Sequence, residues 1–162
     1  MVNIRVAREA DLFPLREILS ACGNFKPFEI EVAIELVRAN LDGSADYMVE
    51  VAVDENDRVL GYICYGLDSM TDGTFNLYWI AVHPRSQGKG IGRLLLEHLE
   101  RRVLELGGRM IVIETSSTER YKSTQNFYLK AGYTLVARIP NYYEMGDDKL
   151  IYMKELDSSN RI

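Results

Sequence analysis

The spacing of apolar residues predicts strands and helices in turn along the first half of the chain. Residues 3–7 alternate between apolar and polar, which is typical of an edge strand. Helical spacing follows over residues 11–21 and 27–41, where apolar side chains recur every three or four positions. The period then becomes that of strands over residues 47–53 and 59–67, which a polar run joins as a hairpin turn.

The second half of the chain alternates strands with helices and ends in two strands. These elements are, in order, the strand 75–82, a leucine-rich helix that ends before Gly107, the strand 110–113, the helix 121–130, and the strands 133–137 and 149–153. The apolar run 110–113 is typical of a central parallel strand. The pattern therefore predicts a mixed α/β fold, with residues 1–156 as a single domain and residues 157–162 as a flexible tail.

The join between the strand 75–82 and the following helix predicts an anion-binding loop. Pro84 ends the strand, because proline has no N–H for a sheet. Gly88, Gly90 and Gly92 carry no Cβ, so successive backbone N–H groups can face one bound group. The helix that follows offers unpaired N–H groups and the positive end of its dipole. A phosphate or a diphosphate is the expected ligand.

Spacing separates three phosphate-binding patterns at this loop. The nucleoside triphosphate loop needs Ser or Thr after Gly-Lys, but Gly90 follows Lys89. The dinucleotide fingerprint needs a glycine six positions along, where Arg93 or Leu95 stands, although Glu114 lies near the offset of a ribose-binding acid. The third pattern, Gln-x-x-Gly-x-Gly, matches from Gln87 onward. A loop without a ligand is disfavoured, because each glycine costs a helix about 0.5–1 kcal/mol.

This motif, with an apolar strand before it and a leucine-rich helix after it, resembles the acetyl-CoA loop of the GNAT superfamily of N-acetyltransferases. The order of the predicted elements is also that of the GNAT fold. The resemblance implies a mixed sheet of about seven strands, flanked by about four helices, whose two central strands splay apart. It also implies that acetyl-CoA is the cosubstrate.

The resemblance assigns cofactor-binding positions to the strand and the loop. The main chain of Ile80, Ala81 and Val82 would pair with the pantetheine arm as an added strand does. The diphosphate would be held by Arg85, Gln87, Gly88, Lys89, Gly90, Ile91, Gly92 and Arg93. The backbone N–H of Val82 is the expected oxyanion donor.

Two residues are candidates for catalysis. Tyr128 stands in an aromatic-Tyr-x-x-x-Gly-aromatic segment at the position of the family's general acid. Glu114 follows an apolar strand, at the edge where α/β folds bind ligands, and is the candidate general base, directly or through water. It could equally be a solvated carboxylate at the end of a strand. The family often has Asn seven residues before its Tyr, where this chain has Tyr121.

The acceptor is expected to be a small-molecule amine or a peptide N-terminus. Glu114, Tyr128 and a run of Asn and Tyr at 141–143 resemble the ribosomal-protein alanine N-acetyltransferases, which would suit a peptide α-amine of pKa about 7.7–8.0. A polyamine, an amino acid and an aminoglycoside stay open. Carboxylates in the segments expected to bound the acceptor would attract a cationic amine, which tyrosine rings could flank. They are Glu29, Glu31, Asp68 and Glu144, the last in a predicted loop over 141–148.

Composition narrows the class of protein. A net charge of −5 over 162 residues argues against a nucleic-acid surface. No secretion signal or membrane-length apolar run is present in the sequence, so a cytoplasmic location without membrane contact is expected. Cys22 and Cys64 are expected in the core, His98 on the surface, and no grouping has metal-ligand spacing. The edge formed by the carboxyl-terminal hairpin is where a homodimer would form.

Two further function classes stay open from the sequence. The first is a module of the same fold that binds or senses acyl-CoA without turnover. The second is a nucleotide-dependent oxidoreductase, which would bind NAD(P)H and not CoA.

Overall fold

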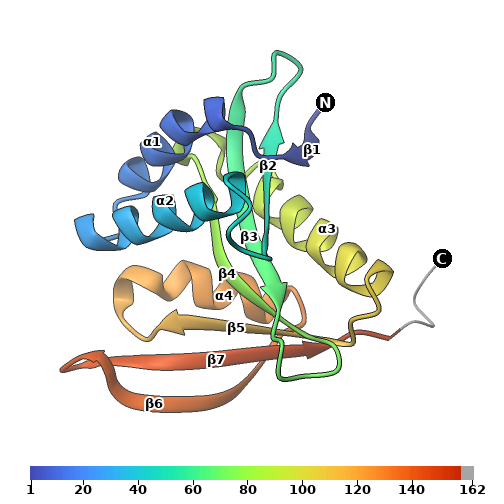
Figure 1. Cartoon of the computed structure of the whole chain (residues 1–162). Coiled ribbons are helices and arrows are strands. Elements are labelled where there is room, and N and C mark those ends of the chain that lie inside the picture. Colours follow the sequence, from blue (N-terminus) through green and yellow to red (C-terminus); the bar gives the residue numbers. More distant parts are fainter. Residues whose placement is uncertain (158–162) are drawn as a thin grey trace. The chain divides into compact units, whose positions relative to one another are not determined.

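The computed structural model describes residues 1–157 (Figure 1). Its helices are α1 (Leu12–Cys22), α2 (Pro27–Leu41), α3 (Ile91–Glu105) and α4 (Lys122–Lys130). Its strands are β1 (Asn3–Val6), β2 (Met48–Val53), β3 (Val59–Leu67), β4 (Thr74–Val82), β5 (Met110–Ser116), β6 (Thr134–Glu144) and β7 (Asp147–Glu155). The predicted tail lies outside the described residues, except for Asp157.

The strands of residues 1–157 form one mixed sheet in the order β1-β2-β3-β4-β5-β7-β6. The pairs β1–β2, β2–β3, β5–β7 and β6–β7 are antiparallel, whereas β4 and β5 are parallel, with a register that runs from Thr74–Met110 to Leu77–Ile113. Seven strands and four helices in the described chain confirm the predicted mixed fold. The chain divides into two compact units, Met1–Gly66 with Tyr78–Leu99, and Leu67–Leu77 with the chain from Glu100 onward.

The first unit is organised around a core between α1, α2 and one face of the strands. Alternate residues of β2 and β3, such as Val51 and Cys64, are fully buried there against Leu15 and Ile34. Pro27 starts α2, and the Glu29 carboxylate accepts a bond from the Lys26 N–H at 2.8 Å, which caps the helix. These packing contacts explain why the two amphipathic helices were predictable to within a residue or two.

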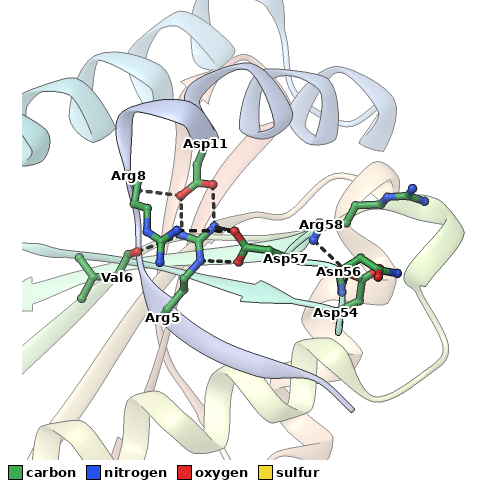
Figure 2. A network of polar contacts seen from close by, with 8 residues as sticks. All are labelled: Arg5, Val6, Arg8, Asp11, Asp54, Asn56, Asp57 and Arg58. Atoms are coloured by element: carbon green, nitrogen blue, oxygen red, sulfur yellow. Dashed lines mark hydrogen bonds and ion pairs between the residues drawn. The ribbon is translucent and has the colours of Figure 1, made fainter.

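A polar network ties β1 to the start of the helices and to the hairpin turn (Figure 2). The Arg5 guanidinium donates two bonds to Asp11, at 2.8 and 3.0 Å, and two to Asp57, at 2.8 and 3.3 Å. Burial opposes the charge of Asp11, but bonds from Arg5 and from the Arg8 N–H outweigh it and lower the pKa of that carboxyl. Asp57 takes a left-handed conformation in the turn, with φ of 61°. The network therefore fixes the edge strand through side chains.

The second unit contains β5, β7, β6 and α4. The Gln125 amide donates to the Ser116 carbonyl at 2.9 Å, and the Ser116 hydroxyl donates to Asp147 at 2.5 Å. These bonds fasten α4 to the ends of β5 and β7. Strand β5 continues to Ser116, so Glu114 lies within the strand and not at its end as predicted.

The structure corrects the predicted loop over residues 141–148. These residues form the end of β6 and the start of β7, joined by a tight turn through Gly146, whose φ is 86° (Figure 1). Asn141 adopts φ of 54°, its N–H donates to Asp148 at 2.8 Å, and its side-chain oxygen accepts from the Gly146 N–H at 2.8 Å. Asn141 therefore bonds across an irregular stretch of the β6–β7 hairpin, where the pairing register shifts.

In residues 1–157 no helix combines the length and apolar character needed to cross a membrane.

Candidate active site

The loop between β4 and α3 has the backbone that an anion site requires. Gly88 and Gly90 adopt φ of 76° and 81°, in the left-handed region that favours glycine. An ideal Cβ at either position meets nothing within 4 Å, so glycine is needed there for conformation and not for space. The preceding turn over Pro84–Ser86 is closed by a bond from the Ser86 N–H to the His83 carbonyl at 2.8 Å.

A run of N–H groups in this loop has no partner within the described chain. The first main-chain bond at the start of α3 is donated by Leu94 to the Gly90 carbonyl, at 2.9 Å. The N–H groups before it, from Gly88 to Arg93, donate to no group in residues 1–157. Six consecutive donors at the positive end of a helix dipole are what binding of a phosphate or diphosphate requires.

The side chains of the loop differ from one another in what they contact. Arg85 and Lys89 are exposed. The Arg93 guanidinium pairs with Glu97 at 3.0 Å, so its side chain is turned along α3. The Gln87 amide donates to the Val82 carbonyl at 3.1 Å, within the protein rather than toward a ligand.

The end of β4 presents alternate main-chain groups to its two edges. The His83 N–H donates to the Leu60 carbonyl at 2.8 Å, so His83 faces β3. The Ala81 carbonyl oxygen lies 2.8 Å from where a Cβ of Gly61 would stand, so Ala81 also faces β3. Because directions alternate along a strand, the polar groups of Ile80 and Val82 face the other edge. Of the three predicted positions, these two have the orientation that an added strand needs.

Tyr128 lies in an aromatic cluster of the second unit. Its ring contacts those of Phe127, Tyr133 and Tyr152, with centroids 5.6, 6.2 and 5.8 Å away. The residue is buried. Burial, and then the neighbouring Tyr121 and Tyr152, raise the pKa of the Tyr128 hydroxyl above its ordinary range. The hydroxyl is therefore protonated at neutral pH, as a proton donor must be.

Glu114 is half exposed and forms an ion pair that the sequence did not indicate. The Lys149 ammonium lies 2.8 Å from its carboxylate and 3.8 Å from the centre of the Tyr142 ring. Burial opposes the charge of Lys149, but bonds to Glu114 and Tyr142 outweigh it and raise the pKa of that ammonium. The one signal in the sequence was a lysine in an otherwise apolar predicted strand.

Glu114 and Tyr128 belong to opposite faces of the β5–β7 pair. Tyr152, which packs on Tyr128, is paired with Ile113, so both side chains point to the α4 face. Glu114 follows Ile113 and points to the opposite face, which it shares with Lys149.

Most of the carboxylates expected to attract an amine have partners within the chain. Glu29 caps α2, Glu31 pairs with Arg16, and Asp68 accepts a bond from the Met70 N–H at 3.1 Å. Glu144 also interacts within the chain. These residues stabilise local structure, so their presence in the sequence does not by itself indicate a cation site.

The two histidines and two cysteines are also placed by internal contacts. His98 is mostly buried, contrary to its predicted surface position. Its Nε2 lies 2.8 Å from the Glu50 carboxylate, which also accepts a bond from the Tyr65 hydroxyl. His83 Nδ1 accepts from the Arg85 N–H at 3.1 Å and so caps a turn. Cys64 is fully buried, as predicted, and burial raises its pKa to about 12. Cys22 is half-buried, and its thiol donates to the Val82 carbonyl at 3.4 Å.

Sequence comparison identifies the family. A model of the acetyltransferase (GNAT) domain matches residues 45–135. An uncharacterized N-acetyltransferase of Methanocaldococcus jannaschii is 32% identical over 110 residues, which are 67% of this chain and 65% of that protein. The matched region thus spans somewhat less than two thirds of that relative.

Solved structures agree with this assignment. A protein assigned to the GNAT family from Desulfovibrio desulfuricans is 38% identical, with a TM-score of 0.91 over 97% of this chain and all of that one. The protein yncA of Salmonella typhimurium, solved with its cofactor acetyl-CoA, is 25% identical, with a TM-score of 0.74 over 97% of this chain and 95% of that one.

The resemblance to ribosomal-protein alanine N-acetyltransferases is also found among solved structures. The enzyme of Brucella melitensis is 25% identical, with a TM-score of 0.73 over 95% of this chain and 99% of that one. From the domain match and the similarity to these relatives, we conclude that this chain belongs to the GNAT family of acetyltransferases.

Proposed function

We propose that the protein is an acetyl-CoA-dependent N-acetyltransferase that transfers the acetyl group to a primary amine by direct attack in a ternary complex. The observation that carries the proposal is the run of unpartnered N–H groups from Gly88 to Arg93. A coenzyme A diphosphate carries two negative charges in the form that this donor set binds. The residues present therefore fit the cosubstrate that yncA holds in its own structure.

The end of β4 supplies the second part of the cofactor site. The outward main-chain groups of Ile80 would pair with an amide of the pantetheine arm, in the manner of an added strand. The Val82 N–H would donate to the thioester oxygen as negative charge develops on it. Exposed Arg85 and Lys89 would add side-chain cations at the diphosphate.

Deprotonation of the acceptor amine is one of two proton movements that the reaction requires. An alkylammonium of pKa about 10.4 costs about 4 kcal/mol to deprotonate at pH 7.4. Glu114 would accept that proton through water. Its ion pair with Lys149 holds the carboxylate in one orientation, and its half-exposed position leaves room for water.

Protonation of the departing thiolate is the second proton movement. As the new carbon–nitrogen bond forms and the carbon–sulfur bond breaks, Tyr128 would donate its hydroxyl proton to the sulfur. Burial keeps the Tyr128 hydroxyl protonated until the thiolate forms beside it. Because Glu114 and Tyr128 belong to opposite faces of the β5–β7 pair, proton removal and proton delivery would take place at separate positions.

The acceptor would carry one reactive amine without further positive charge. Glu29, Glu31 and Asp68 have internal partners, and the Glu114 carboxylate already holds an ammonium. A polyamine or an aminoglycoside would therefore meet few available carboxylates. We favour an amino acid or a peptide N-terminus, and the second of these is the class named for the Brucella melitensis enzyme.

A thermal-shift comparison of acetyl-CoA, NADH and ATP tests the ligand class. A ligand at 100 times its Kd stabilises the folded state by about 2.7 kcal/mol, which is readily measured. We expect stabilisation by acetyl-CoA and CoA alone. Stabilisation by NADH without CoA would support the oxidoreductase and contradict the proposal.

Thiol release from acetyl-CoA, followed across a panel of acceptors, tests turnover. The panel contains amino acids, alanine-starting peptides, spermidine and kanamycin, and product masses identify the modified nitrogen. We expect release with the first two classes. Binding of acetyl-CoA with no release on any amine would favour an acyl-CoA-sensing module.

A further inference from the structure

Val82 has a carbonyl group that two side chains hold. The Gln87 amide donates to it at 3.1 Å and the Cys22 thiol at 3.4 Å. The donors come from different elements, because Gln87 follows the turn after β4 and Cys22 ends α1. A carbonyl oxygen has two lone pairs, so these two bonds use its accepting capacity.

The same carbonyl faces the edge of β4 that points away from β3. His83 and Ala81 face β3, so the N–H and carbonyl of Val82 face the opposite edge. A ligand that adds to this edge as a strand needs both donors and acceptors there. Because two side chains already bond to its carbonyl, Val82 has its N–H as the main-chain group available to such a ligand.

We propose that Gln87 is a positioning residue of the thioester end of the cofactor site, and not a ligand of the diphosphate as its place in the motif suggests. Its amide links the loop back to the last residue of β4, and so fixes the plane and direction of the peptide groups around Val82. The inference rests on the proposed use of acetyl-CoA. It adds that a glycine-loop residue acts on the reacting end of the cosubstrate through the main chain.

Two acyl donors separate these roles. S-acetylpantetheine has the thioester arm of acetyl-CoA but no diphosphate. Gln87→Met removes the amide donor at similar length, and Lys89→Met, in the same loop, removes an exposed cation expected at the diphosphate. The value of kcat/KM is measured for both donors with the best acceptor of the panel, and the Kd of CoA is measured by calorimetry.

We expect Gln87→Met to lower kcat/KM about three- to tenfold for both donors, the size of one lost neutral hydrogen bond. Lys89→Met is expected to lower it for acetyl-CoA and to leave S-acetylpantetheine within twofold. Gln87→Arg, which keeps an N–H donor, is expected to restore turnover of S-acetylpantetheine. A loss confined to acetyl-CoA in Gln87→Met would make Gln87 a diphosphate ligand, and no loss with either donor would show that the bond has no catalytic consequence.

A stability measurement tests the shared carbonyl without any turnover. Cys22→Ala and Gln87→Met each leave one donor on Val82, whereas the double variant leaves the carbonyl bare. The fall in Tm of the double variant should exceed the sum of the two single falls. Additive falls would contradict the shared role. If the wild-type protein binds neither CoA nor acetyl-CoA, both the proposed function and this inference are wrong. A loss confined to acetyl-CoA, no loss with either donor, or additive falls in Tm would overturn the inference alone.

Discussion

The glycine loop after β4 and the hairpin of β6 and β7 are built for recognition in different ways. In the loop the binding groups are backbone N–H donors from Gly88 to Arg93, which have no partner in the described chain. In the hairpin and the adjacent β5 the polar groups are side chains that already bind one another, as Lys149 binds Glu114 and Arg138 binds Asp148. The first region is ready for a ligand, whereas the second is internally satisfied.

In the proposed reaction this difference suits separate tasks for the two regions. A backbone site depends on conformation and tolerates many side chains, which suits a cosubstrate shared across a family. A side-chain site depends on which partners are present, which suits an acceptor that differs between family members. Substitutions should therefore act through backbone strain in the loop and through lost side-chain chemistry in the second unit.

The largest expected effect is that of Tyr128→Phe, which removes one oxygen and keeps the ring packing. If Tyr128 donates the proton to the thiolate, turnover should fall about ten- to a thousandfold, with the Kd of acetyl-CoA almost unchanged. Stopped assays of thiol release give the turnover, and calorimetry gives the Kd.

Tyr133→Phe is the matched control for that change. Tyr133 is buried, its ring centre lies 6.2 Å from that of Tyr128, and its hydroxyl has no hydrogen-bond partner in residues 1–157. Its loss should leave turnover within about twofold. Equal turnover in wild type and Tyr128→Phe would mean that Tyr128 is not the proton donor. The glycine loop would then be the main functional region.

A smaller effect is expected from Gly90→Ala, which tests the backbone site. A side chain at φ of 81° costs about 1–2 kcal/mol in the left-handed region, so the affinity for CoA should fall about 5- to 30-fold. Gly43→Ala is the control, because φ there is 78° and an added Cβ also meets nothing within 4 Å. Both variants should lose stability, but Gly43→Ala should keep the wild-type Kd. Equal Kd values in the two variants would show that loop conformation does not limit binding.

The fold could be predicted from the sequence wherever one pattern decided the structure. Helix α2 has Pro27 at its start and apolar residues at helical spacing, and its predicted bounds agree with the observed ones. The hairpin of β6 and β7 was mispredicted because Asn141 and Gly146 are typical turn residues. Only the pairing of β6 with β7 shows that Asn141 lies at an irregularity within a strand and not in the turn.

The site was predictable for the backbone and less so for the side chains. Glycine spacing indicated the loop because φ values above zero constrain residue type directly. The partner of Glu114 is 35 positions away in the sequence, at Lys149, and their contact follows from the β5–β7 register. The direction of Ala81 toward β3 likewise depends on strand register, which a single sequence does not specify.

Lys89→Met should have a smaller effect than Gly90→Ala, because it removes an exposed cation and leaves the backbone donors in place. The affinity for CoA should fall about two- to fivefold at low salt, and the difference from wild type should shrink at higher ionic strength. Calorimetric titrations at two salt concentrations measure this. A loss larger than that of Gly90→Ala would mean that side-chain charge, and not the backbone, dominates the loop.

The smallest expected effect is that of Lys149→Met, which removes the ion pair with Glu114. Because Glu114 is half exposed, the free energy of unfolding near pH 8 should fall by about 0.5–1 kcal/mol. The pKa of Lys149 is raised in the folded state, so its contribution is complete below the ordinary lysine value of 10.5 and is lost as pH rises through the folded value. Urea titrations should therefore show the two proteins converging above pH 10.5. A difference in the free energy of unfolding that stays constant with pH would mean that Lys149 stabilises the hairpin through packing on Tyr142. Side-chain charge would then matter less in the hairpin than its contrast with the glycine loop requires.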